Sequence, residues 1–159
     1  MSISGVTFSG CHVSAKDHGV LFSAILPDGV LRGCAVTYNS GTASVAPGYL
    51  VACGRVIEVE STSTLAIPGE QYAQIVLTID ASTPTFTLSA VNSSSTTFPP
   101  LTQQDINDGA STTYQIELGV VDIGNGTMLS TIGSVALPVR IVTAVPTSSS
   151  PDGIYLVTN

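Results

Sequence analysis

Residues 49–80 read YLVACGRVIEVESTSTLAIPGEQYAQIVLTID and contain two strand-like runs joined by a Ser/Thr-rich connection. At the end of the first run, residues 57–60 alternate apolar and acidic side chains, which is the period-2 pattern of a strand with one buried and one solvated face. The second run, Gln74–Asp80, is rich in β-branched residues, which favour extended structure. The Pro68-Gly69 pair before it is typical of a turn. This stretch therefore predicts antiparallel strands.

Similar strand-like runs recur along the chain and are separated by turn signals at intervals of about ten residues. They are Val20–Leu26, Val30–Tyr38, Ala43–Val45, Tyr49–Val59, Phe86–Val91, Tyr114–Val120, Met128–Ile132, Val135–Val142 and Ile154–Val157. Short strands at this regular spacing predict an all-β fold. We expect an antiparallel sandwich or barrel-like module with at most one or two short helical turns.

Three local signals refine this prediction. Asn125-Gly126 is typical of a type I′ hairpin, and Gly54 indicates a bulge or the close approach of another chain. The one helix expected is Thr102–Asp108, because Thr102 and Asp105 have the spacing of an N-terminal cap and Gly109 follows the last residue. A helix of this length is a connector and does not contribute a packing face.

The composition divides the chain into two parts. Residues 1–145 are expected to form one all-β structural domain, a size at which a real core can be buried. Residues 146–159 begin with the Pro/Ser-rich segment Pro146–Pro151, which reads as a linker. A last strand follows, and a strand alone leaves its backbone groups unpaired. We therefore predict that it pairs with a neighbouring subunit, as a candidate assembly strand made of Ile154, Tyr155, Leu156 and Val157.

Charge is scarce in this protein. Only 9 % of its 159 residues are charged and the net charge is −7, whereas charged residues make up about 25 % of an average soluble domain. The four basic residues are scattered along the chain: Lys16, Arg32, Arg55 and Arg140. Binding to nucleic acid or to an anionic membrane surface requires clustered basic residues. We therefore expect neither partner, and the chain has no apolar run of the length needed to span a bilayer.

Low charge also bears on assembly. The surface is rich in serine and threonine, which are cheaper to desolvate than charged groups and so suit protein–protein contact. The alternative is an ordinary β domain with threonine-rich strands. The first residues, Met1–Phe8, lack the basic and then apolar regions of a secretory signal, so no secretory route is expected.

The sequence offers no evident catalytic chemistry. Glu58 and Glu60 lie two residues apart on one strand, roughly 7 Å between Cα atoms, within the range of glycosidase carboxylate pairs. Alternate glutamates on a strand are more simply the solvated face of a sheet. Asp105 and Asp108 flank the expected short helix, where capping and solvation explain them. No nucleophile motif or nucleotide-binding loop is present, so we expect a protein that is not an enzyme and holds no cofactor.

Cysteine, histidine and tyrosine side chains are the remaining candidates for a binding site. Cys11, His12 and His18 lie close in sequence, but their spacing matches no structural zinc pattern, and no metal site is expected. We predict that Cys11, Cys34 and Cys53 are reduced and mostly buried, since each lies in or beside an apolar run. The tyrosines could build a glycan site through their aromatic faces, but most occupy strand positions that indicate core packing. They are Tyr38, Tyr49, Tyr72, Tyr114 and Tyr155.

Four segments, in this order, resemble structural proteins of tailed bacteriophages, especially tail-tip, baseplate and fibre-base components. They are Gly29–Val36, Pro47–Glu58, Tyr72–Asp80 and Tyr114–Leu118. The C-terminal stretch, Val145–Val157, resembles a linker-and-strand unit of phage fibre proteins. The resemblance implies a non-enzymatic virion structural protein, an oligomeric module of the tail, the baseplate or their appendages. It also implies assembly in the host cytoplasm.

The same resemblance implies partners. The chain is expected to contact itself, as a homo-oligomer and most commonly a trimer, and to contact other virion proteins. Two alternatives remain open at this point. One is a lectin-like module that binds a glycan or receptor on the host surface. The other is a capsid decoration or head-fibre protein.

Overall fold

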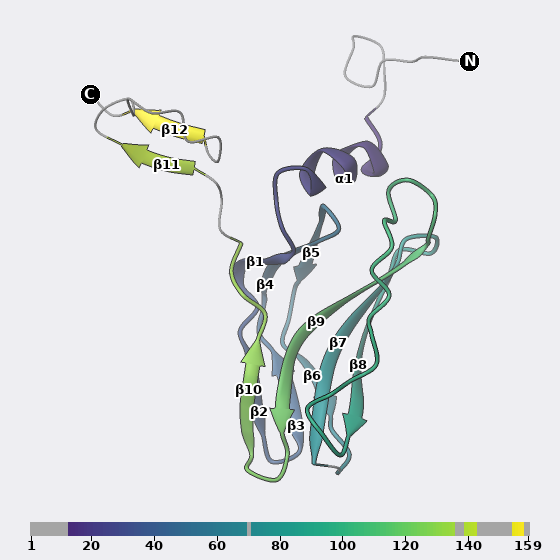
Figure 1. The fold of residues 1–159 in the computed structure, drawn as a ribbon, viewed down its shortest axis with the longest axis vertical. Helices are drawn as coiled ribbons and strands as arrows, with labels where there is room; N and C mark the ends of the chain where they lie inside the picture. The colour runs from purple at the N-terminus through teal and green to yellow at the C-terminus, as the bar shows by residue number, and fades with distance from the viewer. Residues whose placement is uncertain (1–12, 70, 136–138, 143–153, 158–159) are drawn as a thin grey trace.

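The computed structural model describes residues 13–69, 71–135, 139–142 and 154–157 (Figure 1). It confirms the all-β prediction, since strands dominate and the described residues contain one short helix, α1 (Ala15–Ser23). The largest sheet has four strands in the order β10 (Thr127–Thr131), β9 (Thr113–Asp122), β7 (Tyr72–Asp80) and β8 (Thr85–Ser93). Its strands are all antiparallel.

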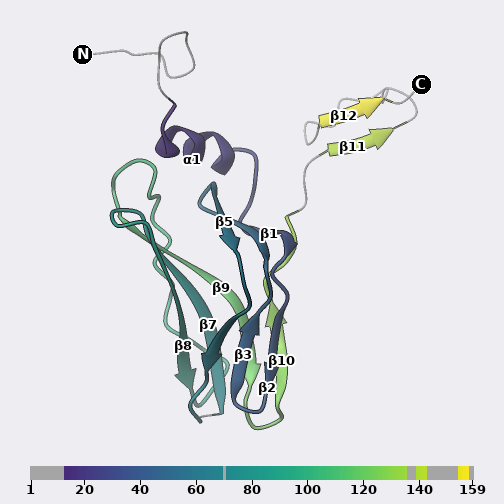
Figure 2. The same ribbon diagram turned by 180° about the vertical axis from the view of Figure 1, so that it is seen from behind.

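Two smaller antiparallel sheets form the second layer. One has the order β1 (Gly29–Gly33), β4 (Gly48–Ala52) and β5 (Arg55–Val59), and the other has the order β2 (Val36–Asn39), β3 (Thr42–Val45) and β6 (Ser63–Ala66). In the two opposite views the first of these sheets lies toward α1 and the second lies at the far end of the molecule (Figures 1 and 2).

The core lies between the two layers. Leu50 of β4, Ile75 of β7 and Leu118 of β9 are almost completely buried, and they belong to one apolar cluster that joins all three sheets. Burial of side chains from two facing sheets is the packing of a sandwich. The alternation read from residues 57–60 is also confirmed, because Ile57 is buried whereas Glu58 and Glu60 are exposed.

Residues with positive φ interrupt two of the predicted long strands. Cys53 (φ 49°) and Gly54 (φ 68°) form a two-residue turn between β4 and β5. Positive φ at both central residues is the geometry of a type I′ hairpin. The expectation of a bulge at Gly54 is therefore wrong, because residues 49–59 form two strands instead of one. The predicted run Val30–Tyr38 is likewise interrupted, and Cys34 (φ 50°) separates β1 from β2, which lie in different sheets.

The predicted helix is in the wrong place. Residues 102–105 have no regular secondary structure and residues 106–109 form a turn, whereas the helix α1 occupies a region where a strand, Val20–Leu26, was expected. A capping box explains its start: the Asp17 backbone N–H donates to Ser14 Oγ (3.2 Å), and the Ser14 backbone N–H donates to Asp17 Oδ2 (2.8 Å). The Ser14 hydroxyl, which donates to Asp17 Oδ2 at 2.6 Å, and the Ser14 backbone N–H hold the pKa of Asp17 below its ordinary value. At nine residues, α1 is too short to cross a lipid bilayer.

A β-bulge changes the face pattern of β9. Ile75 of β7 pairs with Gly119, but Val76 pairs with Glu117, so Leu118 is an extra residue on its strand. The alternation expected over 114–120 therefore holds only as far as Leu118. Beyond the bulge Val121 is buried, whereas the alternation predicts burial of its neighbour Val120.

The hairpin predicted at Asn125-Gly126 is confirmed as the connection of β9 to β10. Its turn differs from the prediction, because Asp122 pairs with Thr127 across a four-residue loop. Gly126 (φ 68°) is the one loop residue with positive φ, so the loop is not a two-residue type I′ turn.

The C-terminal strand is present as β12 (Ile154–Val157). It pairs in parallel with β11 (Val139–Val142), beginning with Val139 beside Ile154. One edge of the predicted assembly strand is thus paired within the same chain. Pairing of this strand with a neighbouring subunit stays a prediction. The linker Pro146–Pro151 and the domain boundary at residue 145 lie outside the described residues.

Candidate functional site

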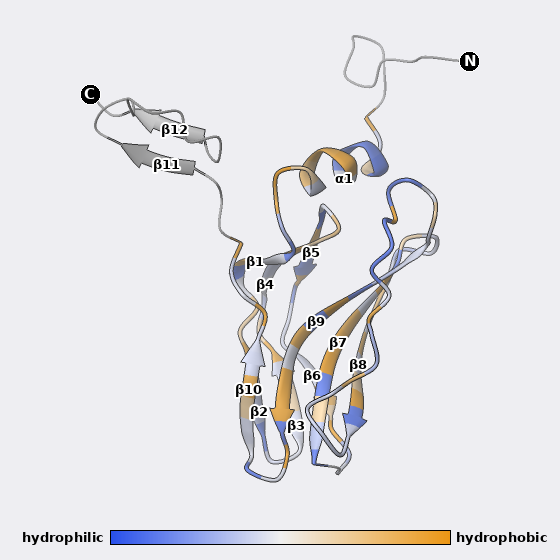
Figure 3. Cartoon of the chain, in the orientation of Figure 1, coloured by the Kyte–Doolittle hydropathy of each residue, from blue (hydrophilic) through white to orange (hydrophobic). Residues whose placement is uncertain are grey.

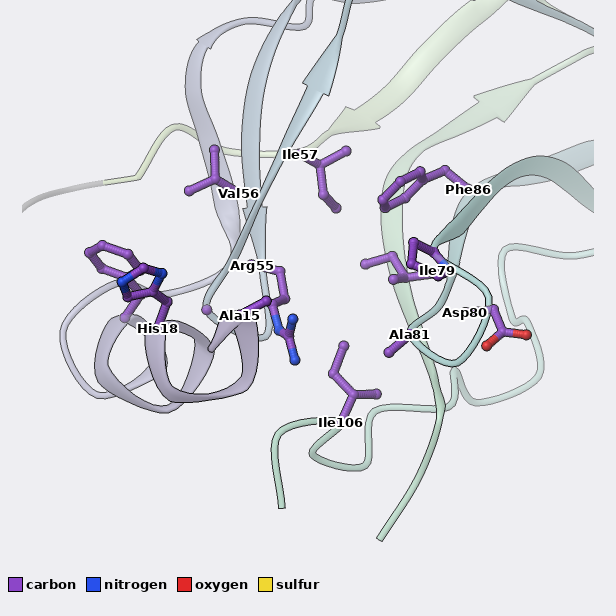
Figure 4. Close-up of a pocket in the computed structure, with 13 residues that line it drawn as sticks. Ala15, His18, Arg55, Val56, Ile57, Ile79, Asp80, Ala81, Phe86 and Ile106 are labelled. Atoms are coloured by element: carbon purple, nitrogen blue, oxygen red, sulfur yellow. The ribbon is translucent and has the colours of Figure 1, made fainter. Parts of the chain in front are cut away.

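A cavity of about 330 Å³ lies where α1 meets the open side of the sandwich (Figure 4). Its walls come from α1, from β5, and from the β7–β8 hairpin. They are mostly apolar, with Phe22, Val56, Ile57, Ile79, Phe86 and Ile106 among the lining residues. Figure 4 shows the Arg55 guanidinium between α1 and Ile106. Such a lining can hold an apolar group beside the charges of Arg55 and Asp80, but it pairs no nucleophile with a base.

A polar network lies beside this cavity and is centred on Asn107, which is 0 % exposed. The Asn107 side chain donates through Nδ2 to the Cys53 carbonyl oxygen (2.9 Å) and accepts through Oδ1 from Arg55 Nε (2.8 Å). Its backbone N–H donates to Asp105 Oδ1 (2.7 Å), and the Cys53 thiol donates to the same oxygen (3.3 Å). One asparagine therefore ties the 105–109 turn to the β4–β5 hairpin.

Asp28 extends the network to two further elements. Its Oδ1 accepts from the Cys53 backbone N–H (2.8 Å), and its Oδ2 accepts from the hydroxyl of Tyr114 (2.7 Å). Asp28 directly precedes β1, whereas Tyr114 lies near the start of β9 in the other layer. The carboxylate therefore joins the two layers at the α1 end of the sandwich.

Helix α1 rests on this network through a glycine. A Cβ at Gly19 would overlap Asn107 Oδ1 and would lie 2.7 Å from Arg55 Nε. A Cβ at Gly54 would overlap the carbonyl oxygen of Gly19 and would lie 2.5 Å from the backbone nitrogen of Ser23. The helix backbone and the hairpin turn are thus in direct contact, which two glycines make possible.

The electrostatics of the network favour a structural role. Burial raises the pKa of the Cys53 thiol, and the hydrogen bond to Asp105 raises it further. Burial and the hydrogen bond to Asp28 raise the pKa of Tyr114 far above its ordinary value. The Asn107 backbone N–H lowers the pKa of Asp105. The thiol and the phenol are therefore neutral and the carboxylate is ionised at neutral pH, so Cys53 is not an activated nucleophile.

Of the carboxylates that the sequence analysis singled out, Glu58 and Asp108 lie outside this network, and Asp105 belongs to it. Glu58 accepts from the Tyr49 hydroxyl at 2.5 Å, which raises the pKa of that tyrosine. Asp105 accepts hydrogen bonds in the network, and Asp108 accepts from the backbone N–H of Ala110 at 2.7 Å. Neither aspartate flanks a helix, because the 105–109 segment is a turn.

The other candidates from the sequence are the histidines and cysteines. His18 is exposed on α1, with its ring 6.2 Å from that of Phe22, whereas Cys11 and His12 lie outside the described residues. Within the part of the chain that the structure describes, no group of three potential metal ligands occurs. Cys34 is buried, as predicted, but Cys53 is only half-buried.

Some of the tyrosines pack in or against the core, as their strand positions indicate. Tyr114 is buried, and Tyr38 is half-buried against the apolar cluster. Tyr49 is different, because the Arg32 guanidinium lies 5.2 Å from its ring centroid. That cation occupies one face of the ring, so a sugar could stack only on the other. The side chain of Tyr155 is outside the described residues.

We expect Cys34 and Cys53 to react slowly with a thiol reagent. The thiolate is the reacting species, and burial raises the pKa of both thiols above the ordinary value, so the thiolate fraction is small at neutral pH and grows only as the pH rises above that value. Labelling of the native protein, read residue by residue by mass spectrometry, should be much slower at both positions than labelling in denaturant. Equal rates in the two conditions would contradict this.

Comparison with family models and with curated proteins found no match for this sequence.

Proposed function

We propose that this chain is a non-enzymatic, self-associating structural protein of a bacteriophage virion, a module of the tail, the baseplate or their appendages. The phage assignment comes from the four segments that resemble tail-tip, baseplate and fibre-base proteins. The observation that carries a role in assembly is an apolar surface on α1 and its flanks, called here the α1 surface. It consists of Val13, Val20, Leu21 and Ile25, which are 42–55 % exposed.

The α1 surface fits protein contact for two reasons. Leu21 is the most exposed large apolar residue of the described chain, at 55 %, and it lies on the same short element as Val20. Figure 3 shows that the second half of α1 is apolar, whereas its first half is hydrophilic. Contiguous exposed apolar side chains mark interaction sites more often than solvated surface. In addition, a surface with few charges is inexpensive to desolvate on contact.

The rigid support of α1 strengthens the proposal. Helix α1 rests directly on the β4–β5 hairpin through Gly19 and Gly54, and Asn107 supports it from below. An interface element that is held in one orientation loses little conformational entropy on binding. The polar network therefore serves to present the α1 surface to a neighbouring virion protein.

A pair of matched substitutions tests this role. Leu21→Glu should reduce incorporation of the protein into virions at least tenfold, because burying the new carboxylate in an interface is costly. Leu129→Glu, on β10, changes a leucine that is exposed to a similar degree, 51 % against 55 %, and should leave incorporation unchanged. Immunoblots of purified particles measure incorporation, and thermal unfolding checks that both variants fold.

The mass of the protein in solution and its location on the virion complete the test. Light scattering should give the mass of a homo-oligomer, three copies by the resemblance, and immunogold labelling should place the protein on the tail. A monomer with labelling confined to the capsid would refute the proposal and favour decoration of the head. A monomer that binds host-surface glycans would favour the lectin-like alternative.

A further inference from the structure

The edges of the sheets differ in how well they are protected against pairing with another chain. Edge strands normally carry charges, bulges or proline, or they are very short. Strand β5 carries Arg55 and Glu58, β1 carries Arg32 and a bulge, and β10 is five residues long with a bulge between Met128 and Ser130. Strands β2 and β6 have only four residues each.

Strand β8 has none of these protections. It is a nine-residue edge strand with the sequence TFTLSAVNS, which contains no charged residue, glycine or proline. It pairs with β7 at all nine positions, from Asp80 beside Thr85 to Tyr72 beside Ser93, without a bulge. Among the described residues no backbone hydrogen bond reaches its outer edge. A long, regular and uncharged edge of this kind is a template for a further strand.

The strand is also complementary to itself. In an antiparallel pair of β8 with β8 about a twofold axis, Ser89 lies at the centre and faces Ser89 of the other copy. Leu88 then faces Ala90, and Thr87 faces Val91. Opposed pairs of β-branched and apolar side chains stabilise antiparallel sheets, and this register brings no like charges together. The contact would join two four-stranded sheets into one.

We propose that β8 is a self-association edge, where two copies of this chain pair antiparallel across a twofold axis at Ser89. This inference rests on the self-association in the proposed function and adds a twofold contact to the threefold one that the resemblance implies. A twofold contact yields two copies on its own, and six copies where a threefold contact also exists. It is separate from the α1 surface, which remains free for other virion proteins.

A charge exchange at the axis tests the contact. Ser89→Lys places two lysines face to face in the pair, and Ser89→Glu places two glutamates there, so each variant alone should dissociate about fivefold more readily than the wild type. Mixing the two variants should restore the pair as a mixed species, detected by native mass spectrometry. Thr127→Lys, on the exposed edge strand β10, is the matched control and should not change the mass.

A second variant covers the case in which a charge at position 89 disturbs folding. Residues opposite each other in an antiparallel pair have Cβ atoms about 5 Å apart, close to disulfide geometry. Ser89→Cys should therefore give a covalent dimer on mild oxidation, whereas Thr127→Cys should not.

The outcomes separate this contact from the proposed function. A trimer whose mass is unchanged by Ser89→Lys, with no crosslink through Ser89→Cys, overturns the β8 contact and leaves self-association standing. A wild-type monomer at high micromolar concentration overturns both. Loss of the pair in each single variant, together with its return in the mixture, supports both.

Discussion

Gly54→Ala is expected to lower the free energy of unfolding by about 4 kcal/mol, since it combines backbone strain with a clash. Gly54 has a φ of 68°, and a methyl group there would overlap the carbonyl oxygen of Gly19 in α1. Neither backbone can move without separating α1 from the hairpin. Denaturant unfolding measures the loss, and hydrogen exchange should show that α1 loses its protection first.

Gly126→Ala is the matched control for this prediction. Gly126 has the same φ of 68°, but no atom lies within 4 Å of the position its Cβ would take. The control should therefore lower the free energy of unfolding only by the strain of a left-handed backbone at alanine, about 1 kcal/mol. Equal losses for the two variants would show that the contact between α1 and the β4–β5 hairpin does not stabilise the fold.

Asn107→Ala is expected to lower the free energy of unfolding by about 3 kcal/mol. The substitution removes the acceptor of Arg55 Nε and the donor to the Cys53 carbonyl oxygen, and it leaves both groups without these partners at a site that is 0 % exposed. The loss of buried hydrogen-bond partners costs more than the hydrogen bonds themselves contribute.

Asn125→Ala provides the comparison. Asn125 Nδ2 also donates to a side chain, Asp122 Oδ2 at 2.8 Å, but Asn125 is exposed in the β9–β10 loop, where water replaces the lost partner. Its substitution should cost less than about 1 kcal/mol. If denaturant unfolding gave the same loss for both asparagines, the Asn107 network would not be the connection between the hairpin and the 105–109 turn.

These two predictions bear on function through α1. Since Gly54 and Asn107 support the helix from the sandwich side, a variant at either position should also reduce incorporation into virions, although neither residue lies on the α1 surface. Ser89 at the β8 edge is far from the helix in sequence and belongs to a different sheet from the β4–β5 hairpin, so substitutions there should act on self-association alone.

Local patterns were sufficient to predict the all-β class and several elements. The alternation at residues 57–60, the β-branched run 74–80 and the Asn125-Gly126 signal each act within a few residues. The first two form the predicted strands, and the third lies in the predicted hairpin, although not as a type I′ turn. The capping box at Ser14 and Asp17 is equally local and was a readable signal for α1. The apolar run that follows it fits a strand as well as a helix, because periodicity alone does not separate the two over so few residues.

The tertiary structure alone decided which elements meet. Asn107 bonds to Cys53 and Arg55, over 50 positions away, and Asp28 bonds to Tyr114, 86 positions away, so no local pattern marks either residue. The bulge at Leu118 and the free edge of β8 depend on strand pairing, which links residues that are distant in the chain. Composition and periodicity therefore determined the kind of structure, whereas long-range hydrogen bonds and sheet order determined the network beneath α1 and the edge that remains open for assembly.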